Sequence, residues 1–176
     1  RRYGYGGYKY IPGLWTDIAK KIIRYYNLSN TSNILDLGSG KAFLLHEIKL
    51  ILPKIEVTGV DISDYAIKSS TDEIRPYLKI ADARKKLPYK NKEFDLLLSL
   101  GLLHNFRLQE LKFVLKEINR ISKSSYIMVE SYRNDRELFN LQCWALTAKS
   151  FLSKNEWIWI YKEFSYDGDY EFIYFS

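Results

Sequence analysis

The stretch Asn33-Ile34-Leu35-Asp36-Leu37-Gly38-Ser39-Gly40-Lys41-Ala42 decides the fold of this 176-residue chain. A short apolar run stops at two glycines, and apolar residues then recur at helical spacing as far as Pro53. The pattern predicts a buried strand, a tight turn and a helix, with the unpaired N–H groups of the helix start beside the turn. A nucleotide fragment is the expected ligand of such a turn.

The same alternation continues along the chain. Further strands are expected at residues 57–60, 77–80, 94–100, 126–129 and 170–175, and helices at 14–26, 63–70, 108–121 and 153–164, while residues 139–151 fit either helix or strand. Strand–helix units in succession predict an α/β, Rossmann-like, doubly wound sheet. We expect six or seven mostly parallel strands with helices on both faces, and an antiparallel strand near the C-terminus.

Composition sets limits on the class of protein. Hydrophobic residues make up 47% and charged residues 27%, which excludes disorder, and no apolar run is long enough to span a membrane. The single cysteine, Cys143, allows neither an intramolecular disulfide nor a CxxC zinc site, and no signal peptide is visible, so a cytoplasmic location is expected. The length predicts one domain over residues 1–176. The net charge of +6 is too modest and too dispersed to predict a nucleic-acid partner.

Two nucleotide-binding motifs are excluded by single residues. The dinucleotide fingerprint G-x-G-x-x-G requires glycine where Phe43 stands. A Walker A loop requires Ser or Thr where Ala42 stands, and its first glycine where Leu35 stands.

The turn resembles the first motif of class I S-adenosylmethionine-dependent methyltransferases, acid-x-G-x-G-x-G, with Ala42 at the third glycine. The resemblance covers about residues 14–130 and implies S-adenosylmethionine as the cofactor. It assigns the turn to the cofactor site through Asp36, Gly38, Ser39 and Gly40. It also implies that Asp61 holds the ribose hydroxyls, that Asp82 and Ala83 contact adenine, and that Ile62 packs on the adenine face. A glycine turn, a helix cap or a solvated loop would explain each residue singly, but not their order.

The segments Ser99–Asn105 and Val129–Asn134 resemble those of short bacterial methyltransferases of small molecules, which adds Leu100 to the cofactor set. The end of the fourth expected strand lacks the D/N-P-P-Y/F signature of nucleobase amine methylation. It also lacks the metal-binding acids of catechol-type enzymes and the paired glutamates of arginine methyltransferases. No metal site is therefore expected.

Candidate catalytic residues follow the fourth and fifth strands. His104 is a candidate general base, because an ordinary histidine pKa suits proton removal at neutral pH; the alternative is a helix cap. Glu130 is a candidate for binding an ammonium group or taking its proton, or else it forms a structural ion pair. Tyr132 and Arg133 follow, and Arg133 is a candidate anchor for a carboxylate or phosphate, or a surface residue.

The aromatic arm and first helix, residues 1–26, are predicted to act as a lid. Within it Tyr10 and Trp15 are candidates to close over the cofactor, although core packing is an equal alternative for Trp15. The predicted function is metal-independent methyl transfer to a nitrogen or oxygen of a small metabolite. Two alternatives remain: an RNA or protein acceptor, using the basic loop 84–92, and a binding module without catalysis. The oligomeric state is not predicted.

Overall fold

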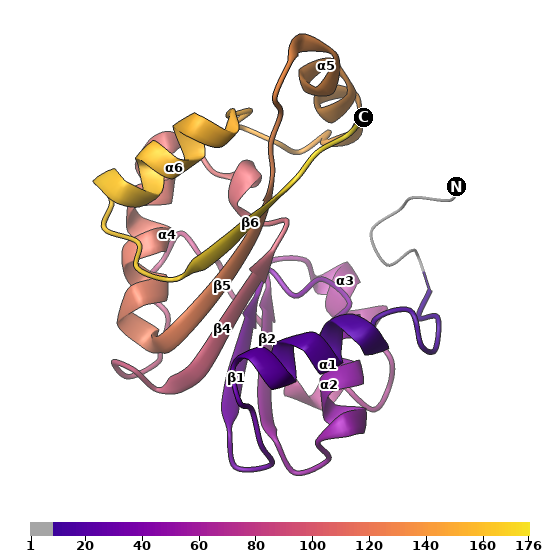
Figure 1. The fold of residues 1–176 in the computed structure, drawn as a ribbon. Coiled ribbons are helices and arrows are strands. Elements are labelled where there is room, and N and C mark those ends of the chain that lie inside the picture. Colours follow the sequence, from indigo (N-terminus) through magenta and orange to yellow (C-terminus); the bar gives the residue numbers. More distant parts are fainter. Residues whose placement is uncertain (1–8) are drawn as a thin grey trace. The chain divides into compact units, whose positions relative to one another are not determined.

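The computed structural model describes residues 9–176, which divide into two compact units at Asp82 and Ala83. Each unit contains three parallel strands with helices beside them (Figure 1). The expected α/β, Rossmann-like fold with six strands is therefore confirmed for the described residues.

The first unit has the strand order β3-β2-β1. Its elements are α1 (Thr16–Tyr25), β1 (Asn33–Leu37), α2 (Phe43–Ile51), β2 (Glu56–Asp61), α3 (Asp64–Lys68), a 3₁₀ turn (Arg75–Tyr77) and β3 (Leu78–Ile80). Helices α1 and α2 lie side by side (Figure 1), and α1 buries Ala19 and Ile22. The β1–β2 register places Asp36 opposite Gly59, two residues before Gly38 of the glycine turn.

Local signals account for the element ends in this unit. Asn27 takes a left-handed conformation, with φ of 51°, just after α1, as expected of a helix-terminating Asn. Of the two residues that could cap α3, Ser63 and Asp64, it is Ser63 whose side chain accepts a hydrogen bond from Ala66 N, at 3.1 Å.

The second unit has the strand order β4-β5-β6. Its elements are β4 (Phe94–Leu100), a 3₁₀ turn (Leu103–Asn105), α4 (Leu108–Ile121), β5 (Ser122–Glu130), α5 (Asp135–Trp144), α6 (Lys154–Glu163) and β6 (Asp169–Ile173). Ser153 and Glu156 form a capping box at the start of α6, which agrees with the helix expected over residues 153–164. Helices α4 and α6 lie beside the strands (Figure 1), and Asn119 of α4 donates to Ser165 O, just after α6, at 2.6 Å.

The predicted antiparallel strand near the C-terminus is wrong. Strand β6 pairs with β5 in parallel, with Tyr126 opposite Asp169 and Glu130 opposite Ile173. The ambiguous stretch 139–151 supplies most of α5. Helices α5 and α6 together connect the carboxyl end of β5 to the amino end of β6. A strand that follows such a helical crossover enters parallel to the one before it.

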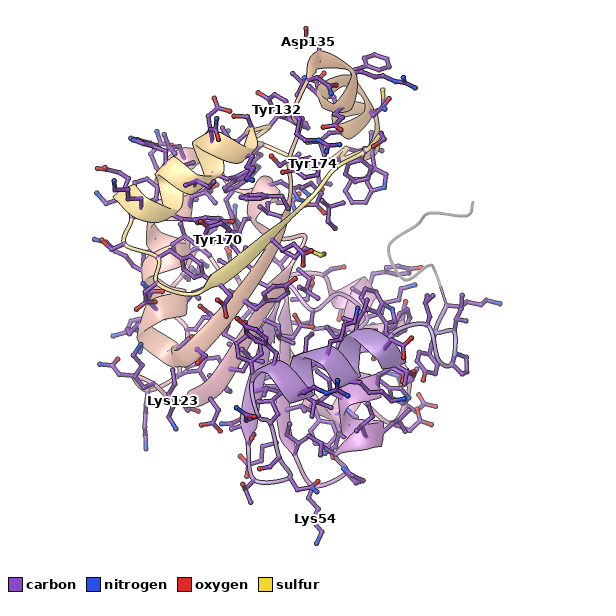
Figure 2. The ribbon with its side chains drawn as sticks, viewed as in Figure 1. Lys54, Lys123, Tyr132, Asp135, Tyr170 and Tyr174 are labelled. Carbon is purple, nitrogen blue, oxygen red and sulfur yellow. The ribbon has the colours of Figure 1, made fainter. Side chains whose placement is uncertain are left out.

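Figure 2 marks the two ends of β5: Lys123 lies at its start, and Tyr132 lies beyond its end. Apart from Tyr10 and Trp15, which precede α1, the predicted site residues of each unit lie at or just after the carboxyl ends of its strands, where ligands bind in open α/β sheets. No helix among residues 9–176 is long and apolar enough to cross a membrane.

The predicted lid falls partly outside the described residues, since Tyr3, Tyr5 and Tyr8 precede them. The lid and the single domain over residues 1–176 stay predictions.

Candidate functional site

The predicted cofactor turn is a strained loop between β1 and α2. Gly38 and Gly40 have φ values of 81° and 54°, in the left-handed region that favours glycine. Ala42 also has a positive φ, 56°, and its N–H donates to Ser39 O at 2.8 Å. A small residue at 42 therefore completes the turn in place of the third glycine of the motif.

Asp61 ties this turn to the loop after β2. Gly40 N donates to Asp61 Oδ2 and Ser63 N donates to Asp61 Oδ1, each at 2.8 Å. A carboxylate offers about four lone-pair positions, so two acceptor positions remain for further donors. The structure thus brings together the turn and the acid that the sequence assigns to the ribose.

The turn and its surroundings fit an adenosyl nucleoside. A Cβ added at Gly40 would meet no atom within 4 Å, so the space beside this backbone is open. Ser39 Oγ is buried and makes no hydrogen bond with the described residues. Ile62, 61% exposed, follows Asp61 and offers an apolar surface of the kind a base ring covers. Gly59 on β2 allows close packing, because a Cβ there would lie 2.4 Å from Leu78 and 2.9 Å from Ser39 Oγ.

The adenine pair of the prediction lies at the division between the units. Asp82 is partly exposed at the end of the first unit, and Ala83 is nearly buried at the start of the second. Their contacts with a base remain predictions.

Asp36 is buried in β1, with 4% of its surface exposed. Burial, and then the charge of Asp61, raise the pKa of the Asp36 carboxyl to about 7. The folded chain therefore holds this proton more tightly than the unfolded chain, whose Asp pKa is about 3.9. The contribution of Asp36 to stability is complete below about pH 4 and is lost as the pH rises through about 7.

We expect Asp36→Asn to raise stability above pH 7, on the order of 1 to 2 kcal/mol, and to change it little at pH 4. Thermal unfolding between pH 4 and 8.5 measures this difference. Asp64→Asn is the control, because Asp64 is exposed and pairs with Lys68 on the surface of α3. A stability difference independent of pH would show that Asp36 carries no raised pKa.

Tyr10 and Trp15 are the two aromatic residues predicted to lie over the cofactor. Tyr10 packs against α2, and Trp15 lies at the start of α1. The Tyr10 hydroxyl donates to Glu47, and the Tyr10 ring packs on Phe43 and edge-on to His46, with centroids 5.7 and 4.7 Å apart. Trp15 is the N-cap of α1, and its buried Nε1 makes no hydrogen bond with the described residues. Sequence reasoning missed Glu47; the only signal was an acidic residue inside the apolar run of α2.

In the second unit, His104 and Glu130 form a buried pair. His104 Nδ1 lies 2.5 Å from Glu130 Oε2, and the two residues are 5% and 1% exposed. A carboxylate at Nδ1 favours the tautomer with its proton on that nitrogen, which leaves Nε2 as an acceptor. The sequence proposed these residues separately, and the structure joins them.

The chain around the pair holds both residues in place. His104 O accepts from Lys149 N and Ser150 N, at 2.8 and 3.0 Å. Trp157 Nε1 donates to Glu130 O at 3.3 Å. Glu130 Oε1 is buried and makes no hydrogen bond with the described residues. A buried carboxylate oxygen of this kind is costly, and one explanation is that a ligand donor completes it.

Arg133 is engaged within the chain. Its guanidinium donates to Glu137 through Nε and Nη2 and lies 4.3 Å from the centroid of the Tyr174 ring.

Burial of Tyr132 raises its pKa, with further contributions from Glu156 and Asp135. Figure 2 shows Tyr132 and Tyr174 near α5, and Leu100 ends β4 partly exposed. In residues 9–176 no group of three or more His, Cys, Asp or Glu is arranged to hold a metal ion.

Comparisons with known proteins identify the family and the fold. A family model described as a methyltransferase domain matches residues 28–165. The malonyl-[acyl-carrier protein] O-methyltransferase of Legionella pneumophila is 29% identical over 91 residues, which cover 50% of this chain and 31% of that protein. The chain thus spans about a third of the length of this curated relative.

Solved structures share the fold at low sequence identity. A chain in the complex of the Haloferax volcanii Trm112 methyltransferase activator with a methyltransferase superposes with a TM-score of 0.66 at 20% identity, covering 85% of this chain and 67% of that one. The YcgJ protein of Bacillus subtilis superposes with a TM-score of 0.67 at 16% identity, covering 83% and 66%. At these identities the likeness shows the fold alone. The family match over residues 28–165 shows more: the chain belongs to the methyltransferase-domain family, with the fold of the class I, S-adenosylmethionine-dependent methyltransferases.

Proposed function

We propose that this chain transfers a methyl group from S-adenosylmethionine to a nitrogen or oxygen of a small metabolite, without a metal ion. The observation that carries the proposal is the buried His104–Glu130 pair at the carboxyl ends of β4 and β5. It is a base with its own orienting carboxylate, which suits an acceptor that must lose a proton.

The first unit supplies most of the proposed cofactor site. Asp61 would accept the ribose hydroxyls while it holds the turn, and Ile62 would pack on the adenine. Asp36 and the turn 38–40 would lie near the methionine part, with Tyr10 and Trp15 closing over it. The resemblance also assigns Asp82, Ala83 and Leu100 to the cofactor. When bound, the cofactor supplies an electrophilic methyl group on a sulfonium.

The second unit supplies the proposed proton acceptor. His104 Nε2 would take the proton from the acceptor hydroxyl or amine, and Glu130 would stabilise the imidazolium that forms. Tyr132 would line the acceptor side, and Arg133 would anchor only an acceptor that carries a carboxylate or phosphate. Because a protein base removes the proton, the reaction requires no metal-bound nucleophile. The single cysteine, Cys143, is exposed and unpaired, which supports a reducing, cytoplasmic location.

We expect radiolabelled methyl groups to pass from S-adenosylmethionine to small molecules of a cell extract, with rates unchanged by EDTA. The label is followed separately into metabolite, RNA and protein fractions. Label in RNA or protein would replace the small-molecule acceptor, and loss of transfer on chelation with recovery by magnesium would overturn metal independence. Binding of adenosylhomocysteine without any transfer would support the non-catalytic module instead.

A further inference from the structure

The buried carboxylate of Glu47 holds the segment that leads into α1. Its Oε1 accepts from the Tyr10 hydroxyl and from Gly13 N, the latter at 3.3 Å, and its Oε2 accepts from Thr16 Oγ1 at 2.6 Å. Glu47 is only 3% exposed, although it lies on a helix whose neighbouring buried residues are mainly apolar. One side chain of α2 thus fixes three points within residues 10–16.

The charges around Glu47 favour this arrangement. Burial alone would raise the pKa of Glu47, but the hydrogen bonds from Thr16, Tyr10 and Gly13, with the nearby His46, lower it. Burial and Glu47 raise the pKa of Tyr10 to about 12, so the phenol keeps the proton that it donates. The carboxylate is therefore ionised and hydrogen-bonded at neutral pH, a strong form of hydrogen bond.

The location of Glu47 connects this segment with the cofactor turn. Tyr10 packs on Phe43, the first residue of α2, which directly follows the turn 38–42. Thr16, one of the three donors, is adjacent to Trp15, whose indole N–H is buried without a partner among the described residues. Ser39 Oγ in the turn is also buried and makes no hydrogen bond with the described residues. Two buried polar groups, one in the segment and one in the turn, thus lack a hydrogen-bond partner among the described residues.

We propose that Glu47 is a positioning residue for the cofactor: it fastens residues 10–16, and with them Trp15, to the helix that leads out of the cofactor turn. The inference rests on the proposed function, because it takes the turn 38–42 and Asp61 as the cofactor site. Glu47 itself makes no contact with the cofactor in this proposal. Its effect passes through the segment it holds.

The test measures the binding of adenosylhomocysteine by calorimetry and the hydrogen exchange of a peptide spanning residues 9–16. In the wild type, we expect the ligand to slow exchange in this peptide further. In Glu47→Ala, exchange should be fast with and without ligand, and Kd should rise about tenfold. Glu47→Gln should stay within about threefold of the wild type, because its amide oxygen still accepts from Tyr10 and Gly13.

Two comparisons separate positioning from stability. The double variant Tyr10→Phe, Thr16→Val removes two donors and leaves Glu47 in place, and it should reproduce most of the rise in Kd even if Glu47→Ala fails to fold. Lys49→Met removes the hydrogen bonds from Lys49 Nζ to Pro53 O and Ile55 O, at 3.3 and 3.0 Å, and so loosens the end of α2 without removing a contact to residues 10–16. It should lower Tm but leave Kd within twofold.

A purely structural role would appear as a lower Tm in the Glu47 and double variants with an unchanged Kd and unchanged ligand-induced protection, and this result would overturn the inference. If the wild type itself does not bind adenosylhomocysteine, the proposed cofactor site fails and this inference fails with it. If the wild type binds and all variants bind equally, only the role of Glu47 is lost.

Discussion

Replacing Asp61 with alanine is expected to weaken adenosylhomocysteine binding by roughly 1.5 to 3 kcal/mol, about a 10- to 150-fold rise in Kd. The variant removes the acceptors of Gly40 N and Ser63 N, and also the acceptor proposed for the ribose hydroxyls. Isothermal titration measures the change. Asp64→Asn, which removes only a surface pair with Lys68, should bind within about twofold of the wild type.

A deoxy analogue separates the ribose contact from the loop contact. If Asp61 binds the ribose, the wild type should lose affinity for the 2′-deoxy form of adenosylhomocysteine, while Asp61→Ala should lose little more. Equal losses in both proteins would mean that Asp61 acts only by holding the turn. Binding of NADH with no binding of adenosylhomocysteine would contradict the cofactor prediction altogether.

Elements with local signals were predictable from the sequence. β1 and β4 have the expected bounds, because each is a largely apolar run that is followed directly by glycine. The starts of α3 and α6 follow from Ser63 and Ser153, whose side chains cap the helices next to them in sequence. These signals act within a few residues, so a single sequence contains them.

The direction of β6 was not predictable in the same way. Residues 139–151 show no decisive period, and α5 begins earlier, at Asp135, where Asn134 caps it by accepting from Glu137 N. Without α5, a short connection and a turned-back strand are the simpler expectation. Strand direction depends on the whole crossover, not on the strand's own residues.

The candidate site shows the same difference between features with local signals and contacts between distant residues. The order of turn, Asp61 and Asp82 is readable because each follows a strand end, but the bonds of Glu47 to residues 10–16 and of His104 to Glu130 join positions far apart in the chain. The pairing of Arg133 with Glu137, however, follows the i,i+4 spacing. That spacing was a signal against Arg133 as a free carboxylate anchor.

The largest effect is expected at the buried pair. His104→Gln should lower kcat about 10²- to 10⁴-fold, because it removes the proposed base, and should leave the Kd of adenosylhomocysteine within about threefold. Removing one partner of a buried hydrogen-bonded pair costs stability, so Tm and circular dichroism must show that the variant is folded at the assay temperature. A folded His104→Gln with full activity would exclude His104 as the base.

Glu130→Gln then tests the class of acceptor. If the acceptor is an amine, its N–H groups would bind the carboxylate oxygen Oε1, and Glu130→Gln should impair kcat/KM far more than cofactor affinity. Arg133→Ala is the matched comparison: Arg133 is 56% exposed at its side chain and already paired with Glu137, so its loss should change turnover little. The opposite result, full activity in Glu130→Gln and none in Arg133→Ala, would exclude the amine. Arg133 would then leave Glu137 to anchor the acceptor, and the methylated group would be a hydroxyl or a carboxylate.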